Sequence, residues 1–147
     1  MLPNELLDTY SRDLKTIELS KFLQKENEVS LGGLCGNLKV IIPLSISYLK
    51  ENNHCFICAD KKEAMLYYSN LCNYLNNEKV FFFPYSNRKP YDDELINNAN
   101  VIMRTETIQH LKENKNEKTY VVTYPEGLVE LYPCLLYTSD AADERHC

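Results

Sequence analysis

Four short runs, each followed by a predicted helix, constrain the fold of this chain more than any other feature. The runs cover residues 28–31, 54–59, 80–83 and 120–123. The last three are continuous rather than alternating in hydrophobicity, which is typical of strands that are buried on both faces in a parallel sheet. The sequence therefore predicts a doubly wound α/β domain, in which a mainly parallel sheet has helices on both faces.

Helices are predicted before, between and after these strands. Apolar residues recur at near-helical spacing over residues 4–25, which indicates one or two amphipathic helices. Asp60 and Glu63 have the spacing of a capping box, which begins a helix directly after the run 54–59. A further helix is expected over Leu95–Leu111, and Pro125 opens a last helical turn.

The helix over Leu95–Leu111 is expected to bury its apolar side chains and to expose its polar ones. The residues predicted to be buried are Ile96, Ala99, Ile102, Met103 and Leu111. Arg104, Thr105 and Glu106 are expected to form an exposed or domain-facing stripe, with Arg104 as a surface ion-pair partner.

Residues 33–40 read GLCGNLKV, which is close to the phosphate-binding loop G-x-x-x-x-G-K-[ST]. Gly33 and Lys39 occupy the positions of the first glycine and the lysine. Leu38 replaces the second glycine and places a branched side chain where phosphates must approach. Val40 replaces the serine or threonine and has no oxygen to bind Mg²⁺. We therefore interpret the segment as a degenerate nucleotide-binding loop.

A short strand over Glu28–Leu31 is predicted to lead into this loop, and a helix to follow Asn37, its expected N-cap. Because Pro43 lies in that helix, the helix is either kinked there or begins later than Asn37. Gly36 is interpreted, like the first glycine, as a turn-former. Lys39 is interpreted as a remnant that can still attract an anion to the helix N-terminus.

Nucleotide hydrolysis also needs an acidic residue that holds Mg²⁺ at the end of a later strand. The only apolar run that ends in an acid is Cys55–Asp60, and Asp60 is better explained as a helix cap. No Asp-Glu pair directly follows a later strand. We therefore expect no catalytic residue and no cofactor in this segment, and the alternative is that Lys39 alone supports ATP binding.

The run His54-Cys55-Phe56-Ile57-Cys58 raises the question of a zinc or redox site. Residues three apart in a strand point to opposite faces, so Cys55 and Cys58 cannot both bind one metal without a bend. We expect no metal site, and reduced, buried thiols instead.

Charge and hydropathy narrow the class of protein further. The net charge of −5 argues against binding of nucleic acid by charge alone. No apolar run approaches the roughly 20 residues that span a bilayer, and the first residues lack the pattern of a signal peptide. The expected location is cytoplasmic.

A charged loop that contains proline is predicted over residues 84–94. Loops at the carboxyl ends of strands form the ligand surface of doubly wound sheets. Arg88, Lys89 and Tyr91 are therefore candidate contacts with DNA or with another domain. The alternative is a solvated connection between two elements.

The end of the chain does not continue the alternation of strands and helices. Residues 135–147 read LLYTSDAADERHC, which resembles translated sequencing-adapter sequence. We expect a fragment whose natural sequence continued past Pro133, so that the predicted sheet is truncated. The expected organisation is N-terminal helices over 1–27, a degenerate α/β domain over 28–133 and a non-native tail over 134–147.

Six short segments carry a resemblance to a known family. They read LGGLCG at 31–36, CADKKEA at 58–64, FFP at 82–84, KPYD at 89–92, RTE at 104–106 and VTYPE at 122–126. In this order and spacing they resemble the N-terminal region of the bacterial transcription-repair-coupling factors. The resemblance covers roughly residues 5–133.

The resemblance implies a fold similar to the first nucleotide-binding-like subdomain of the excision-repair helicase UvrB. That fold belongs to the P-loop NTPase and RecA-like class. The resemblance also implies that this segment has no ATPase activity. It also implies a parent protein that translocates on double-stranded DNA with ATP and Mg²⁺, releases stalled RNA polymerase and recruits UvrA for nucleotide excision repair. The motor and the main UvrA contacts lie downstream of this sequence. The resemblance also implies that Arg88 and Lys89 face the DNA path.

This segment would then be a non-catalytic scaffold next to the UvrA-binding domain. Two alternatives remain at this point. One is an active, ATP-binding, UvrB-like helicase domain, and the other is a free-standing interaction domain.

Overall fold

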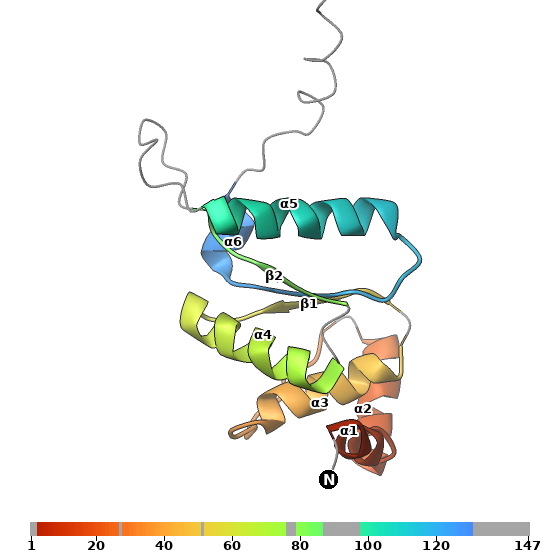
Figure 1. The fold of residues 1–147 in the computed structure, drawn as a ribbon. Coiled ribbons are helices and arrows are strands. Elements are labelled where there is room, and N and C mark those ends of the chain that lie inside the picture. The colour runs from red at the N-terminus through yellow and green to blue at the C-terminus, as the bar shows by residue number, and fades with distance from the viewer. Residues whose placement is uncertain (1–2, 27, 51, 76–78, 87–97, 131–147) are drawn as a thin grey trace, which may run out of the picture.

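The computed structural model describes residues 3–26, 28–50, 52–75, 79–86 and 98–130. Within these ranges the chain forms helices and strands in the order expected for an α/β protein (Figure 1). They are α1 (Pro3–Ser11), α2 (Leu14–Lys25), α3 (Leu38–Tyr48), β1 (His54–Ile57), α4 (Lys61–Leu75), β2 (Val80–Phe83), α5 (Asn98–Glu113), β3 (Tyr120–Thr123) and α6 (Pro125–Val129).

The three described strands form one parallel sheet in the order β1-β3-β2. The central strand β3 aligns Tyr120 with His54 of β1 on one side and with Val80 of β2 on the other. The three predicted strands that correspond to them are confirmed, although β1 ends at Ile57 rather than at residue 59. Their continuous apolar character fits strands that are covered on two sides.

Helices cover both faces of this sheet (Figure 1). The helices α5 and α6 lie on one face, and α4 lies on the other together with α3, α1 and α2. The predicted α/β class, with a parallel sheet between helical layers, is therefore confirmed.

Aromatic side chains join the sheet to α4. The ring of Tyr120 stacks on His54 and Phe56, with centroid distances of 5.5 and 6.5 Å. Phe56 packs in turn on Tyr67 of α4 at 5.2 Å. Beside these rings, the side chain of Leu71 is fully buried, and a leucine buried in this way contributes roughly 1.5–3 kcal/mol to folding.

The N-terminal segment forms two helices, as predicted, and Asp13 separates them. The Asp13 carboxylate accepts hydrogen bonds from the N–H groups of Lys15 and Thr16 at 3.0 and 3.3 Å, which caps α2. Leu7 of α1 is buried in the same cluster as the sheet residues. The helix α1 thus shares the core of the sheet.

The helix α3 begins at Leu38, directly after Asn37, and runs through Pro43. A later start of this helix is thereby excluded. Because proline has no N–H, it leaves the carbonyl of Lys39, four residues earlier, without its helical donor. The hydroxyl of Tyr67 donates to that carbonyl at 3.0 Å. A side chain of α4 therefore replaces the missing helical hydrogen bond.

The helix α5 buries a different face from the one predicted. Ala99 is exposed and Ile102 is 55% exposed, so both predictions were wrong. Met103 and Leu111 are partly buried, and Ile96 lies outside the described residues. The fully buried residues of α5 are instead Asn100, Arg104 and Thr107. The expected exposure of Arg104 was therefore also wrong.

Candidate functional site

The loop that resembles a phosphate-binding loop is not preceded by a strand. Residues 28–35 have no regular secondary structure, so the predicted strand Glu28–Leu31 was wrong. The run has only two apolar side chains, Val29 and Leu31, and Leu31 remains 43% exposed. So little burial does not offset the entropy of ordering a strand. A phosphate-binding loop needs a strand, a loop and a helix in succession, and only the last two are present in the described structure.

The glycines of the loop adopt conformations that glycine favours. Gly33 and Gly36 have φ values of 78° and 56°. A Cβ atom at either position would meet no other atom within 4 Å. The loop thus uses these glycines for their left-handed backbone rather than for a close approach to neighbouring groups.

The backbone N–H groups at the start of α3 are already bonded within the turn. Leu38 donates to the carbonyl of Cys35 at 3.2 Å, and Lys39 donates to that of Gly36 at 3.3 Å. Val40 donates to the carbonyl of Asn37 at 3.0 Å. A phosphate would need these same donors, so its binding requires the turn to open.

The side chains of the loop do not converge on a ligand. Val40 is buried in the core cluster with Leu7 and Leu44, and Leu38 is half-buried. Lys39 is exposed, and its Nζ lies 3.8 Å from Oε1 of Glu63 on α4. The structure therefore directs the lysine of the motif towards a carboxylate, which would repel a polyphosphate.

A cavity of about 250 Å³ lies beside this ion pair. Its lining includes Gly36, Lys39, Glu63, Tyr67 and Asn70. Burial raises the pKa of Tyr67, and the charges of Cys58 and Glu63 add to this effect. The Tyr67 hydroxyl stays protonated and remains a donor to α3. The cavity thus presents one lysine, one carboxylate and a phenol that is already engaged.

Asp60 acts as the cap of α4, as predicted. Its Oδ1 accepts a hydrogen bond from the N–H of Glu63 at 2.8 Å. The Glu63 carboxylate returns to accept one from the N–H of Ala59 at 3.0 Å. This pair resembles a capping box, except that Glu63 bonds the N–H of the residue before the cap. It engages both carboxylates near the loop.

The cysteines of the described residues are free thiols. Cys58 is buried, as expected, whereas Cys55 is exposed, so the prediction of burial was wrong for Cys55. Burial, with smaller contributions from Glu63 and Asp60, raises the pKa of Cys58 to about 11. Among the described residues, no group of three or more His, Cys, Asp or Glu side chains is placed to hold a metal ion.

A buried polar cluster at the carboxyl end of the sheet centres on Arg104. Its Nη1 donates to the carbonyls of Pro84 and Gly127, each at 2.8 Å. The guanidinium also lies 4.0 Å from the ring centroid of Phe83. Nη1 is 3.3 Å from Oε2 of Glu130, and the two side chains are only 3% and 10% exposed. One arginine thus joins α5 to the end of β2 and to α6.

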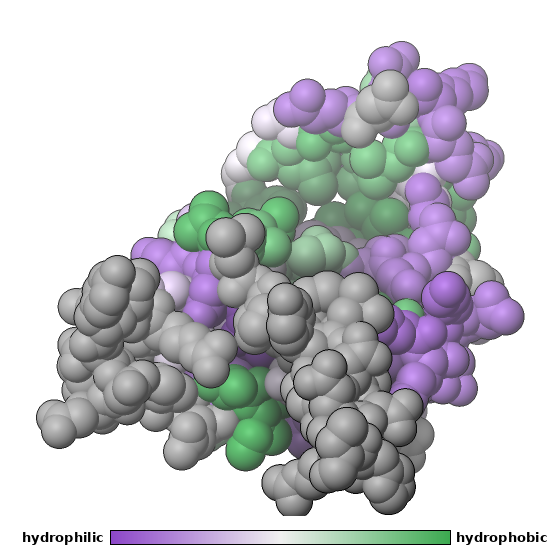
Figure 2. Space-filling model, turned by 90° about the horizontal axis from the view of Figure 1, so that it is seen from above, coloured by the Kyte–Doolittle hydropathy of each residue, from purple (hydrophilic) through white to green (hydrophobic). Residues whose placement is uncertain are grey.

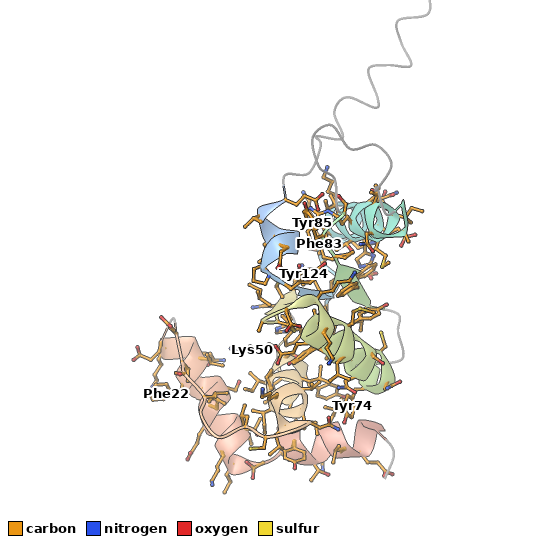
Figure 3. The ribbon with its side chains drawn as sticks, turned by 90° about the vertical axis from the view of Figure 1, so that its left-hand side faces the viewer. Phe22, Lys50, Tyr74, Phe83, Tyr85 and Tyr124 are labelled. Atoms are coloured by element: carbon orange, nitrogen blue, oxygen red, sulfur yellow. The ribbon has the colours of Figure 1, made fainter. Side chains whose placement is uncertain are left out.

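Further hydrogen bonds extend this cluster to the residues that follow β2. Both the N–H and the hydroxyl of Ser86 donate to the carboxylate of Glu130. The side chain of Asn100 donates to the carbonyl of Tyr85 at 2.8 Å, and the N–H of Tyr85 donates to the hydroxyl of Tyr124 at 3.0 Å. Figure 3 shows Phe83, Tyr85 and Tyr124 close together beside α5 and α6. The groups of the cluster bond to one another, which favours a structural role.

Sequence reasoning missed this cluster because it assigned polar residues to the surface. One signal was available in the spacing. Asn100, Arg104 and Thr107 are four and three residues apart, so they lie on one face of a helix. Polar side chains on one helix face can be buried only where backbone groups accept their hydrogen bonds. Carbonyls after β2 and in α6 provide the acceptors for Asn100 and Arg104, and the carbonyl of Met103 in α5 itself accepts from the Thr107 hydroxyl.

The candidate contact residues Arg88, Lys89 and Tyr91 lie outside the described residues. Within the described part, no helix is both long enough and apolar enough to cross a membrane. Comparisons with protein families, with curated proteins and with solved structures find no match for this chain.

Proposed function

We propose that this chain is a non-catalytic α/β scaffold in which the remnant of a nucleotide-binding loop has a structural role. One observation carries the proposal. The N–H groups of Leu38, Lys39 and Val40 are bonded within their own turn, and the Lys39 side chain points to Glu63. The N–H groups that would hold a phosphate therefore stabilise the turn before α3, and the Lys39 side chain links α3 to α4.

The ordered sequence segments support a more specific proposal. The chain would be the N-terminal region of a transcription-repair-coupling factor, with a P-loop NTPase and RecA-like fold similar to the first subdomain of UvrB. Its parallel sheet between helical layers is compatible with such a fold. ATP and Mg²⁺ would then belong to a motor in the downstream part of the parent protein.

The partners follow from the same proposal. The parent protein would bind double-stranded DNA and stalled RNA polymerase, and a downstream domain would bind UvrA. Arg88, Lys89 and Tyr91 would contact DNA or another domain of the same chain. Contacts of Arg88 and Lys89 with phosphates would weaken steeply as the salt concentration rises.

ATP hydrolysis by the purified chain tests the non-catalytic role. We expect no release of phosphate above that of a Lys39→Ala control. Hydrolysis that depends on Lys39 would instead support the alternative of an active helicase domain. The Lys39 side chain is exposed, so a nucleotide has access to it.

The family proposal has its own test, which is recovery of the open reading frame from source DNA. We expect several hundred further residues with an intact G-x-x-x-x-G-K-[ST] motif and an Asp-Glu pair. An early stop codon after residue 147 would favour the free-standing interaction domain instead.

A further inference from the structure

The outer edge of β1 is exposed to solvent. Among the described strands, β1 pairs only with β3. The N–H groups of His54 and Cys58 donate to carbonyls on the β3 side, at 2.8 and 2.9 Å. Backbone groups of successive residues point to opposite edges of a strand, so those of Cys55 and Ile57 point away from β3. Cys55 is exposed and Ile57 is 60% exposed, so the edge is accessible to another chain.

This edge lacks the charged side chains and prolines that prevent the edges of natural sheets from pairing. The residues of β1 include no lysine, carboxylate or proline. Burial, and secondly the charge of Lys118, lowers the pKa of His54 below 6.5, so its ring is uncharged at neutral pH. The residues of β2, at the other edge of the described sheet, are all buried or half-buried. The edge of β1 is therefore the one that invites a partner.

Apolar surface continues from this edge onto one face of the sheet. Phe56 packs on Tyr67 of α4, and alternate residues of a strand face opposite sides, so Cys55 and Ile57 face the side of α5. Val121 lies beside Cys55 in the register of the sheet and is only half-buried. Seen from the α5 side, apolar residues gather around a hollow (Figure 2). A strand that joins this edge therefore needs apolar side chains on the same face.

We propose that the outer edge of β1 pairs with the same edge of a second copy of this chain, in an antiparallel, two-fold arrangement centred on Phe56. The two outward residues lie symmetrically about Phe56, so Cys55 of each copy comes opposite Ile57 of the other. Residues opposite each other in this way exchange both of their backbone hydrogen bonds. Centring on Cys55 or on Ile57 would instead place one outward residue opposite a residue outside β1. The strand is thus complementary to itself in one register.

The side chains fit the same register. On the α5 side, each Ile57 gains a cysteine neighbour whose Cα atom is about 5.5 Å away. On the α4 side, the two half-buried Phe56 rings come side by side, with Cα atoms about 4.5 Å apart. Aromatic pairs across strands stabilise a sheet. The contact closes after two copies, because both β1 edges are then used.

The small size of the contact sets its expected strength. Each copy contributes a strand of 4 residues, and interfaces that bury less than about 1,200 Å² are typical of weak, transient complexes. We therefore expect monomers at low protein concentration and dimers at high concentration. The pairing is independent of the proposed scaffold function, because it uses neither the candidate loop nor Lys39.

Sedimentation velocity of the purified chain over a range of concentrations tests the dimer, with a reductant present to prevent disulfides between exposed cysteines. We expect Ile57→Lys to raise the dimer Kd at least about tenfold, because a lysine guards an edge against pairing. The matched control is Ile102→Lys, since Ile102 is similarly exposed, at 55%, but lies on α5. We expect this variant to keep the Kd of the unmodified chain.

A mass that stays monomeric at every concentration would overturn the proposal. A dimer that Ile57→Lys leaves intact, or that the two lysine variants weaken equally, would overturn it as well, because the contact would then lie elsewhere. Growth beyond the dimer would contradict the closed two-fold arrangement.

Amide exchange in the unmodified chain gives a reading that needs no variant. The N–H groups of Cys55 and Ile57 should exchange more slowly at high than at low protein concentration, because they donate to the second copy only in the dimer. Exchange at these two positions that does not depend on concentration would contradict the pairing.

Discussion

The carboxylate of Glu130 lies 3.3 Å from Nη1 of Arg104, and both side chains are almost fully buried. The pair holds α6 against the end of β2, because the same guanidinium nitrogen binds the carbonyls of Pro84 and Gly127. Charges removed from water cost stability unless they are paired and hydrogen-bonded. Arg104 satisfies this condition within the described structure, and its removal would leave Glu130 buried without its ionic partner.

Arg104→Met is therefore expected to lower the free energy of unfolding by about 3–5 kcal/mol, the usual cost of removing one member of a buried ion pair. Urea denaturation measures the change. The matched control is Arg12→Ala, which breaks an exposed ion pair with Asp8 and should cost about 0–1 kcal/mol. Equal losses in the two variants would contradict the structural role of the cluster.

Gly127→Ala tests how closely α6 packs against the sheet. A Cβ atom at this position would lie 2.7 Å from Oγ1 of Thr123 and 2.8 Å from the carbonyl oxygen of Phe83. Relief of such overlap in a packed interior costs about 1–3 kcal/mol, which thermal unfolding would show as a lower Tm. Gly32→Ala is the control, because open space surrounds that position. An unchanged Tm in the Gly127 variant would show that α6 is not seated as described.

The two helix caps beside the candidate loop should respond differently to alanine. Asp60→Ala removes the acceptor of the Glu63 N–H and should cost about 0.5–2 kcal/mol, as for other N-caps. Asn37→Ala should have little effect on the urea midpoint, because the Asn37 side chain makes no capping hydrogen bond. A larger loss for the Asn37 variant would mean that this asparagine caps α3 after all.

We expect the free energy of unfolding to decrease at acidic pH because of His54. Burial, and secondly the charge of Lys118, lowers the pKa of His54 below its ordinary value of 6.5, and its Nε2 is buried without a hydrogen-bond partner in the described structure. As the pH falls through 6.5, the unfolded chain takes up this proton before the folded chain does, so the free energy of unfolding decreases. The stability that the fold gains from a neutral His54 is fully present above pH 6.5.

The comparison uses His54→Phe, which keeps a ring against Tyr120 but cannot titrate. Between pH 7.5 and 5.5 the urea midpoint of the unmodified chain should fall further than that of the variant. Parallel curves for the two proteins would exclude His54 as a source of the acid sensitivity.

Sequence patterns predict the framework of this protein well, because each element depends on local signals. The strand Val80–Phe83 is a run of apolar residues stopped by Pro84, and the structure confirms its bounds. The pair of caps at Asp60 and Glu63 is likewise a local arrangement, and both carboxylates accept hydrogen bonds from nearby N–H groups. Such features need no knowledge of distant segments.

The errors arise where the outcome depends on residues far apart in the chain. The burial of Arg104 is decided by carbonyl acceptors that lie 20 or more residues away. The backbone of Glu28–Leu31 is irregular because its few apolar side chains are too little buried, with Leu31 still 43% exposed, and that burial depends on packing partners elsewhere in the chain. In the same way, the ion pair of Lys39 depends on Glu63 across two helices.

The most direct test of the non-catalytic role is isothermal titration of the purified chain with ATP and Mg²⁺. The turn that engages the N–H groups of Leu38–Val40, and the carboxylate of Glu63 beside Lys39, predict no saturable heat and no difference between the unmodified chain and Lys39→Ala. Binding in the micromolar range that is lost in Lys39→Ala would contradict the account, because the loop would then hold phosphate after all.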